Sequence, residues 1–420
     1  MIKFEKFELA NGLKFLVNCD NTTQMATFNI LYDVGARDEN PEKTGFAHLF
    51  EHLMFGGSIN IDKYDDAVQN AGGQNNAYTT NDVTNYYINL PAINIETAFW
   101  LESDRLLSLN FSDDKLNVER NVVIEEYKQR YLNAPYGDMM ALIRKLAYKV
   151  HPYQWQTIGK DIAHIENATL EDVKAFFFKH YAPNNAIVAI TGNVNIEEMK
   201  TLAEKWFGDI PRRNVPVRNL PQEPIQQEYR LLTVERGVPN DMLVMAFHID
   251  NQSSPRFRQF DLLSSILSKG SSSRLNYNLT KQNNFFTFID AYVEAQMDKG
   301  LLLIMGMPSA NLTMQEAEEE VWKELYKLTT ELVGDEELQK VKNSEISSHI
   351  YSQISIKERA STLAANELAG NANLINTIEQ DYESVTDAQI IAVAKEIFVK
   401  ERCSVLYYCS NSKQTDDQDR

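Results

Sequence analysis

Hydrophobic and polar residues follow a helical period most clearly over residues 45–57. Apolar residues stand at positions 46, 49, 50 and 53, which is the i, i+3, i+4, i+7 spacing of one helix face. Gly56 and Gly57 then end the predicted helix. Within this helix, His48 and His52 are four residues apart, so their imidazoles lie one turn apart on the same face.

The same periodicities predict strands and helices along the rest of the chain. Residues 2–34 are expected to form strands around Asn11-Gly12, a dipeptide typical of hairpin turns, and residues 27–32 are rich in strand formers. The other predicted strands are 72–82 (after a glycine turn), 86–90, 186–190, 229–235, 242–249 and 403–407, and the predicted helices are 62–69, 95–107, 113–132, 169–181, 260–269 and 386–398.

A helix opened by threonine and followed by a strand occurs twice at the same offsets, about 217 residues apart. Helix 169–181 leads to strand 186–190, and helix 386–398 leads to strand 403–407. A single repeat of domain size indicates a duplication of the whole domain.

The chain has 420 residues, which suits two domains of about 200 residues each. Four prolines between positions 211 and 224 fall in a polar stretch that indicates an exposed linker. We therefore expect a first domain at 1–210, a linker at 211–227, a related second domain at 228–410, and a disordered polar tail at 411–420.

Composition narrows the choice of partners and compartment. The net charge of −18 argues against a nucleic-acid partner. No run of 18 apolar residues exists, so no membrane span is expected. The first residues lack the apolar core of a signal peptide, so we expect the cytoplasm, or the periplasm if a signal peptide has been removed. Cys19, Cys403 and Cys409 lack metal-binding spacing and fit a reducing compartment.

The two histidines and Glu51 have the chemistry of a metal site. Two imidazoles one turn apart can bind one tetrahedral metal ion. Glu51 flanks the same face, where it could take a proton from a metal-bound water. The alternative is two surface histidines beside a helix-favouring glutamate. Leucine, phenylalanine and methionine surround the polar residues, which favours a buried helix and the metal interpretation.

A catalytic zinc site has three protein ligands and a water, and helix 113–132 offers the third ligand. Glu119 and Glu126 are seven residues apart on one face, whereas Glu125 points about 100 degrees away. A solvated face is the common explanation for such charges, but Val122 and Val123 between them favour partial burial. We interpret Glu126 as the ligand. Glu119 is interpreted as a catalytic carboxylate that does not bind the metal itself but supports its ligands.

The polar strand within 72–82 is a candidate for binding a peptide. Strands of this composition often lie at sheet edges, and an edge beside a metal can pair with an extended peptide. The candidate substrate residues are Asn76, Ala77, Tyr78 and Thr79. The alternative is a surface hairpin with no ligand.

These motifs together resemble the pitrilysin, or insulinase, family of zinc metallopeptidases, which includes beta-type subunits of mitochondrial processing peptidase and two-domain bacterial members. The resemblance spans nearly the whole chain. It implies Zn2+, one ion per chain, with His48, His52 and Glu126 as ligands and Glu51 as general base. It also implies an α+β fold of two homologous α/β-roll domains, each an antiparallel sheet covered by helices. The matching motifs are His48-x-x-Glu51-His52, Glu119 to Glu126, Gly72-Gly73-x-x-Asn76-Ala77-x-Thr79, His151-Pro152-Tyr153, Tyr181 to Asn185, and Ile190-Thr191-Gly192.

The second half departs from the family pattern. Helix 260–269 has no histidine, so the second half cannot bind zinc in the same way. Active members carry an arginine and, seven residues later, a tyrosine that stabilise the developing oxyanion, and we align these with Thr280 and Thr287. Arg274 and Tyr277 are nearby at the wrong spacing.

The sequence therefore predicts a zinc endopeptidase subunit acting on unfolded peptides. The two threonines suggest that a homologous partner without the zinc motif supplies the arginine and tyrosine in a heterodimer, with a homodimer as the alternative. A rival hypothesis is a structural or assembly subunit that keeps the fold and has lost the chemistry. A non-proteolytic hydrolase has no feature in its favour.

Overall fold

A computed structural model describes residues 1–411, so the predicted tail lies outside the described residues except for Asn411. The chain forms two compact units, each built from three segments. Among the helices of the described residues, none has both the length and the apolar character needed to cross a membrane. The predicted boundaries of the domains and linker follow the sequence repeat and stay a prediction. Unit 1 comprises Met1–Gln129, Trp155–Leu220 and His349–Thr377, and unit 2 comprises Arg130–Gln154, Pro221–Ser348 and the described part of Ile378–Arg420.

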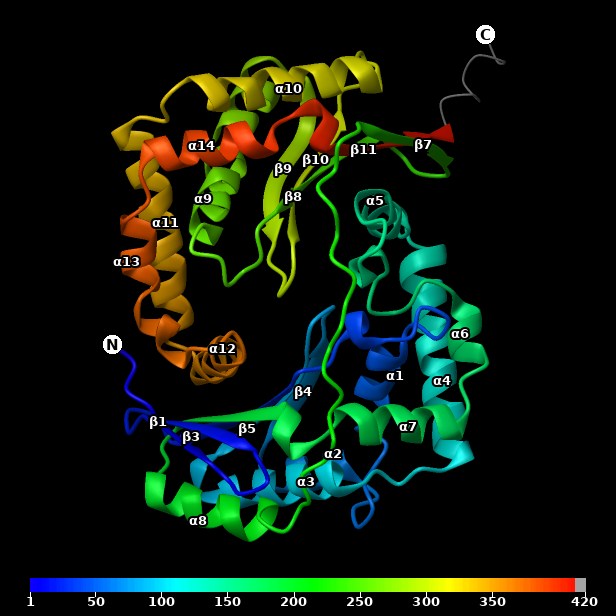
Figure 1. The fold of residues 1–420 in the computed structure, drawn as a ribbon, viewed down its shortest axis with the longest axis vertical. Coiled ribbons are helices and arrows are strands. Elements are labelled where there is room, and N and C mark those ends of the chain that lie inside the picture. Colours follow the sequence, from blue (N-terminus) through cyan, green and yellow to red (C-terminus); the bar gives the residue numbers. More distant parts are fainter. Residues whose placement is uncertain (412–420) are drawn as a thin grey trace. The chain divides into compact units, whose positions relative to one another are not determined.

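The first unit contains a six-stranded sheet in the order β1-β2-β6-β3-β5-β4 (Figure 1). Only β2 and β6 run parallel; the other neighbours are antiparallel. The predicted turn at Asn11-Gly12 is confirmed, because it joins β1 to β2 and Gly12 has a φ of 91°. The strands are β1 (Glu5–Glu8), β2 (Lys14–Cys19), β3 (Met25–Tyr32), β4 (Gln74–Thr79), β5 (Thr84–Pro91) and β6 (Ala186–Gly192).

The second unit repeats this topology in a five-stranded sheet, ordered β7-β11-β8-β10-β9. Its parallel pair, β7 with β11, takes the place of β2 with β6 in the first sheet. The order matches β2-β6-β3-β5-β4 strand for strand, so the predicted duplication and the α+β class with two related halves are confirmed. The strands are β7 (Arg230–Arg236), β8 (Met242–Ile249), β9 (Phe286–Glu294), β10 (Gly300–Pro308) and β11 (Cys403–Ser410).

Helices cover both faces of the first sheet (Figure 1). On one face, α3 (Ile95–Leu107) and α8 (Ile196–Phe207) pack on the sheet through aromatic rings, such as Phe28 against Phe99 with centroids 5.0 Å apart. The other face is covered by α12 (Ile356–Leu368), which buries Leu363 and Ala364 against the sheet. Because α12 comes late in the chain, the first sheet is completed by a helix from the second half.

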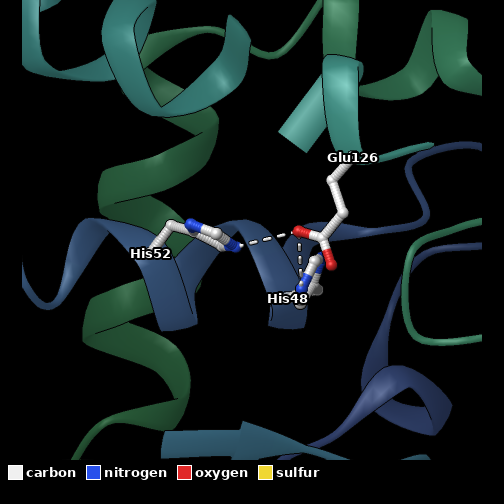
Figure 2. A group of neighbouring side chains, drawn as sticks. All are labelled: His48, His52 and Glu126. Atoms are coloured by element: carbon white, nitrogen blue, oxygen red, sulfur yellow. Dashed lines mark ion pairs between the residues drawn. The ribbon is translucent and has the colours of Figure 1, made fainter. Parts of the chain in front are cut away.

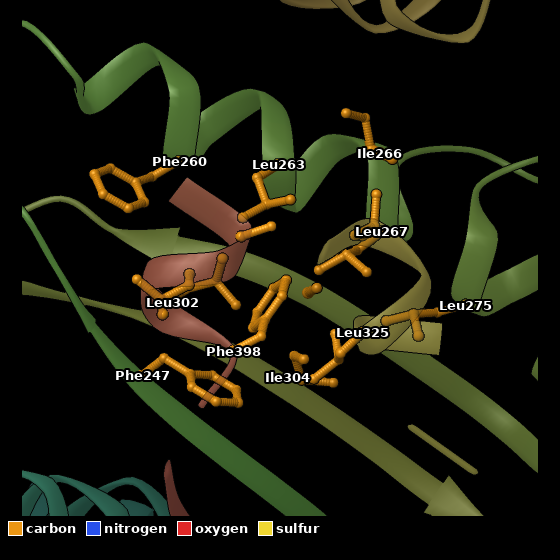
Figure 3. Close-up of a cluster of buried hydrophobic side chains, with 14 of the residues drawn as sticks. Phe247, Phe260, Leu263, Ile266, Leu267, Leu275, Leu302, Ile304, Leu325 and Phe398 are labelled. Atoms are coloured by element: carbon orange, nitrogen blue, oxygen red, sulfur yellow. The ribbon is translucent and has the colours of Figure 1, made fainter. Parts of the chain in front are cut away.

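The second sheet is covered in the same manner. Helices α9 (Phe257–Ser268), α10 (Met314–Thr330) and α14 (Asp387–Ile397) bury one face in the large apolar core of Figure 3, where Phe247 meets Phe398 edge to face. Helix α5 (Met139–Ala147), from the first half of the sequence, covers the other face. Each sheet thus carries one helix from the opposite half of the chain.

The remaining elements connect these layers. The other α-helices are α1 (Phe46–Leu53), α2 (Tyr64–Asn70), α4 (Asp113–Tyr127), α6 (Ile162–Glu166), α7 (Leu170–His180), α11 (Asp335–Ser352) and α13 (Ile378–Glu383). Two π-helical segments are η3 (Lys128–Leu132) and η6 (Asn276–Gln282), and short 3₁₀ turns are η1 (Ala36–Asp38), η2 (Ala92–Asn94), η4 (Pro152–Gln154), η5 (Pro183–Asn185), η7 (Ala372–Asn376) and η8 (Lys400–Arg402).

One expectation needs correction and another needs an addition. The helix predicted over 113–132 is α-helical only to Tyr127 and continues as a wider π-helical turn. The linker predicted at 211–227 has no helix or strand and is mostly exposed, but two of its side chains, Glu223 and Gln226, are buried. Arg218 pairs with Asp33 and Asp38 in unit 1, and Glu223 is buried in unit 2, where it accepts three backbone N–H bonds. Polar side chains therefore fix a segment whose prolines prevent regular structure.

Candidate functional site

Helix α1 presents a polar face from an otherwise buried segment. Its apolar residues Phe46, Leu49 and Phe50 are at most 3% exposed and fix the helix in the unit. The i, i+3, i+4 spacing then leaves His48, Glu51 and His52 together on the half-buried side. The predicted helix and the shared face of the two histidines are present in the structure.

The start of α1 is fixed by a carboxylate that the sequence analysis did not identify. Gly45 has a φ of 90°, and a Cβ there would lie 2.6 Å from the carbonyl oxygen of Ile158, so only glycine fits. The carboxylate of Glu39 accepts hydrogen bonds from the backbone N–H of Gly45 (2.9 Å) and of Ala47 (2.8 Å). Glu39 therefore caps the N-terminus of α1, because it accepts hydrogen bonds from backbone N–H groups that have no partner within the helix.

Glu39 is buried, with 6% of its surface exposed. Burial raises the pKa of Glu39 to about 8, although the N–H groups of Ala47 and Gly45 and the indole of Trp155 oppose the shift. The uncharged acid is thus the form that the folded protein favours near neutral pH.

Glu126 extends from α4 to the two histidines (Figure 2). Its Oε2 lies 3.6 Å from Nε2 of His48 and 3.4 Å from Nε2 of His52. The three donor atoms lie within 4.8 Å of one another. In a tetrahedral zinc site with ligand distances of about 2.1 Å, neighbouring ligand atoms lie about 3.4 Å apart. Two nitrogen donors and one oxygen donor at this spacing fit one zinc ion and leave a position for water.

The other two glutamates of α4 lie differently. Oε2 of Glu119 is 3.7 Å from Nδ1 of His52, the ring nitrogen that faces away from Glu126. Partial burial raises the pKa of Glu119, and His52 opposes the shift. Glu125 is 72% exposed and pairs with Lys128. The seven-residue spacing thus brings Glu119 and Glu126 to His52 and leaves Glu125 in solvent, which is the arrangement that the helix period predicts.

Strand β4 lies beside Glu51. The hydroxyl of Thr79 donates a hydrogen bond to Oε2 of Glu51, 2.5 Å away. Because side chains alternate along a strand, Ala77 shares the face of Thr79, whereas Asn76 and Tyr78 point to the other face. The four predicted substrate residues therefore divide into two pairs with different surroundings. The link between Thr79 and Glu51 could not be read from the sequence.

The strand is also the edge of its sheet. Its one partner strand is β5, so the other side of its backbone has no neighbouring strand in the sheet. On the partner strand β5, Tyr86 pairs with Ala77 and is fully buried. The guanidinium of Arg105 lies 4.3 Å from the centre of the Tyr86 ring and is paired with Glu102, with both charged groups buried. This buried packing fixes Tyr86, and with it the strand β5 against which β4 is paired.

The described part of the second half contains no counterpart of the ligand set. Among residues 1–411, His48, His52 and Glu126 form the one group of His, Cys, Asp or Glu with metal-binding spacing. Thr280 lies in the π-helix η6 and Thr287 on β9. Arg274 is paired with Glu337 at 2.8 Å, so its guanidinium is already engaged.

Comparison with known proteins gives consistent matches. The family described as "Insulinase (Peptidase family M16)" matches residues 14–158, and the family described as "Peptidase M16 inactive domain" matches residues 167–345. The chain is 28% identical over 404 residues to "Zinc protease PqqE" of Helicobacter pylori, covering 94% of this chain and 90% of that protein. It is 30% identical over 213 residues to "Mitochondrial-processing peptidase subunit beta" of Saccharomyces cerevisiae, covering 50% and 46%. A crystal structure of a protease from Helicobacter pylori superposes with a TM-score of 0.91 at 27% identity, covering 97% of this chain and all of that one.

The carboxyl group of Glu39 should make the stability of the protein depend on pH. Its pKa is raised on folding from 4.5 to about 8, so the stability that it contributes is fully present below about pH 4.5 and is lost as the pH rises to about 8. In metal-free protein, the free energy of unfolding should therefore fall with pH across this window, by up to about 1.4 kcal/mol per unit. Denaturant titrations of the metal-free protein at a series of pH values measure this dependence of the free energy of unfolding on pH.

Glu39→Gln should flatten this slope, because the amide does not ionise. Glu42→Gln is the matched control, since the Glu42 side chain in the same loop is 84% exposed. If the curve of Glu39→Gln runs parallel to that of the parent protein, Glu39 is not the group that titrates.

Proposed function

Because the chain belongs to the insulinase (M16) peptidase family, we propose that it is a zinc-dependent endopeptidase that cleaves unfolded peptides. The observation that carries the proposal is the convergence of His48, His52 and Glu126 at the separations of a tetrahedral zinc site. These three residues are the proposed ligands of one zinc ion per chain. Zinc bound there would polarise the scissile carbonyl and make a water molecule more acidic.

Glu51 is the proposed general base. It is on the same helix face as the two histidines, three residues after His48 and directly before His52 in the His-x-x-Glu-His motif. Its carboxylate would take the proton of the attacking water and pass it to the leaving amine. Glu119 beside Nδ1 of His52 would accept a hydrogen bond from Nδ1–H, which keeps the ring proton on Nδ1 and leaves the lone pair of Nε2 for the metal.

The open edge of β4 is the proposed binding site for the peptide. An extended peptide paired with β4 would use backbone hydrogen bonds, which do not depend on the peptide's sequence. Asn76 and Tyr78 on one face and Ala77 on the other would then contact its side chains. Pairing along this edge needs an extended segment whose backbone has no strand partner, which an unfolded peptide supplies along its whole length, and this supports unfolded peptides as substrates.

The alternative function is a structural or assembly subunit that keeps the fold without the chemistry. Two observations favour it: the second half matches a family described as inactive, and threonines occupy positions 280 and 287. The complete set of His48, Glu51, His52 and Glu126 argues for the enzyme, because a scaffold has no need of converging ligands and a base.

Three variants of the purified chain test the proposal. Glu51→Gln should retain zinc at one per chain and lose at least about 10³-fold in cleavage of a quenched-fluorescent peptide library, because the amide cannot accept a proton. Glu126→Gln should lose both zinc and cleavage, and Glu125→Gln, its exposed neighbour, should keep both. Cleavage by Glu51→Gln at the parent's rate would contradict the role of Glu51 as general base. Zinc bound by Glu126→Gln as tightly as by the parent would contradict the role of Glu126 as a ligand.

We also propose that full activity needs a homologous partner chain that lacks the zinc motif and carries the arginine and tyrosine. The proposal is supported by the short, uncharged side chains of Thr280 and Thr287 and by the engagement of Arg274 with Glu337. A second copy of this chain is the alternative partner. One relative, of Saccharomyces cerevisiae, is itself named a subunit of a peptidase.

Reconstitution tests the partner. The zinc-loaded chain alone should turn over peptide at least about ten-fold more slowly than its mixture with the homologue, because the oxyanion is then stabilised by two more groups. Replacing the homologue's arginine by alanine should remove the gain. Full turnover by the isolated chain, with a specific rate that does not change on dilution, would show that no partner of either kind is required.

A further inference from the structure

We propose that Thr79 is a positioning residue whose hydroxyl holds the Glu51 carboxylate in its working orientation. The inference rests on the proposed function, since Glu51 is taken as the general base. It also revises the role expected for Thr79, which the sequence analysis placed among the residues that contact the peptide.

The hydroxyl and the carboxylate are in direct contact. Oγ1 of Thr79 donates to Oε2 of Glu51 over 2.5 Å, the short distance of a hydrogen bond to a charged acceptor. Both side chains are half-buried. A glutamate side chain has three rotatable bonds, and at a half-buried position its carboxylate can rotate toward solvent. A hydroxyl on the neighbouring strand restricts that rotation, because every other rotamer loses the hydrogen bond.

Thr79 is itself held firmly. It pairs in the antiparallel ladder with Thr84, which is buried and whose hydroxyl donates to the carbonyl oxygen of Val34 at 2.9 Å. As a β-branched residue in a strand, Thr79 has few allowed χ1 rotamers. The contact therefore ties the side chain of Glu51, on helix α1, to a rigid position on the sheet. General-base catalysis needs this, because a carboxylate displaced by about 1 Å can cost up to 10²-fold in rate.

The geometry separates this role from peptide binding. A peptide that extends the sheet pairs with β4 in the plane of the sheet through backbone groups, whereas side chains project perpendicular to that plane. The hydroxyl of Thr79 is turned toward α1 and engaged with Glu51. Removing it should therefore leave the backbone edge intact and disturb only the base. The same strand carries the proposed peptide edge and the group that orients the base.

Two variants of Thr79 separate the hydroxyl from the shape of the side chain. Thr79→Val keeps the branched shape and removes the hydroxyl, and it should lower kcat about ten-fold with KM within about two-fold of the parent. Thr79→Ser keeps the hydroxyl and should restore kcat to within about three-fold. The assay uses the zinc-loaded protein, with its partner chain if turnover requires one.

Thr22→Val is the matched control. The hydroxyl of Thr22 donates to the carboxylate of Asp20 over 2.6 Å in an exposed turn, so this variant deletes the same kind of bond away from the site. Its kcat and KM should equal those of the parent. Thermal unfolding of all three variants shows whether a loss of kcat comes from a loss of fold.

A second readout does not depend on activity. In crystals of the metal-free protein, Glu51 should occupy one rotamer in the parent and in Thr79→Ser, and more than one rotamer in Thr79→Val. A single unchanged Glu51 rotamer in Thr79→Val overturns the proposal. So does a higher KM with unchanged kcat, which would make Thr79 a peptide contact.

The kinetic outcomes also distinguish the inference from the function it rests on. If Glu51→Gln abolishes cleavage and Thr79→Val leaves kcat unchanged, Glu51 is the base and the positioning role is wrong. If Glu51→Gln cleaves at the parent's rate, the proposed function fails first. The crystallographic arm then still decides whether Thr79 fixes the rotamer of Glu51.

Discussion

The site depends on one geometric constraint: three donor atoms from two helices have to meet within a few ångströms at a half-buried position. Two of them, the Nε2 atoms of His48 and His52, are set by the helical repeat alone. The third, Oε2 of Glu126, is set by the packing of α4 against α1. Since zinc–ligand distances vary by only about 0.2 Å, the packing of the two helices decides whether these three atoms can bind one ion together.

Much of the surrounding structure serves that requirement. The left-handed Gly45 allows the chain to enter α1, and Glu39 satisfies the N–H groups at its start. Apolar residues on the opposite face of α1 anchor the helix in the unit. The edge strand β4 then places an open backbone and the hydroxyl of Thr79 beside Glu51, the proposed base. The same strand order recurs in the second unit, whose described residues carry no counterpart of His48, His52 and Glu126, so the proposed chemistry belongs to one copy of the duplicated scaffold.

What the sequence could predict is what a single helix or strand determines. The His-x-x-Glu-His spacing, the choice of Glu119 and Glu126 over Glu125, and the helices and strands that the sequence analysis named follow from local periodicity, whereas several helices, such as α8 and α10, were not predicted. Contacts made through the fold were not found: Glu39, which bonds Gly45 six residues later, was not identified, and Thr79 was expected to contact the peptide although it bonds Glu51, 28 residues away. Helices α5 and α12, each on the sheet of the opposite half, were not predicted either, and an amphipathic pattern shows only that a helix packs, not on which sheet. The buried side chains of the linker were missed because a polar, proline-rich composition usually marks exposure.

X-ray absorption at the zinc edge tests the central claim most directly. On the purified chain loaded with one equivalent of zinc, we expect a four-coordinate site with two imidazole nitrogens at about 2.0–2.1 Å and oxygen ligands from Glu126 and water at about 2.0–2.2 Å. Glu126→Gln should change this coordination shell, and Glu125→Gln should leave it as in the parent. Failure to retain zinc, a shell with no imidazole scattering, or a spectrum unchanged by Glu126→Gln would contradict the account.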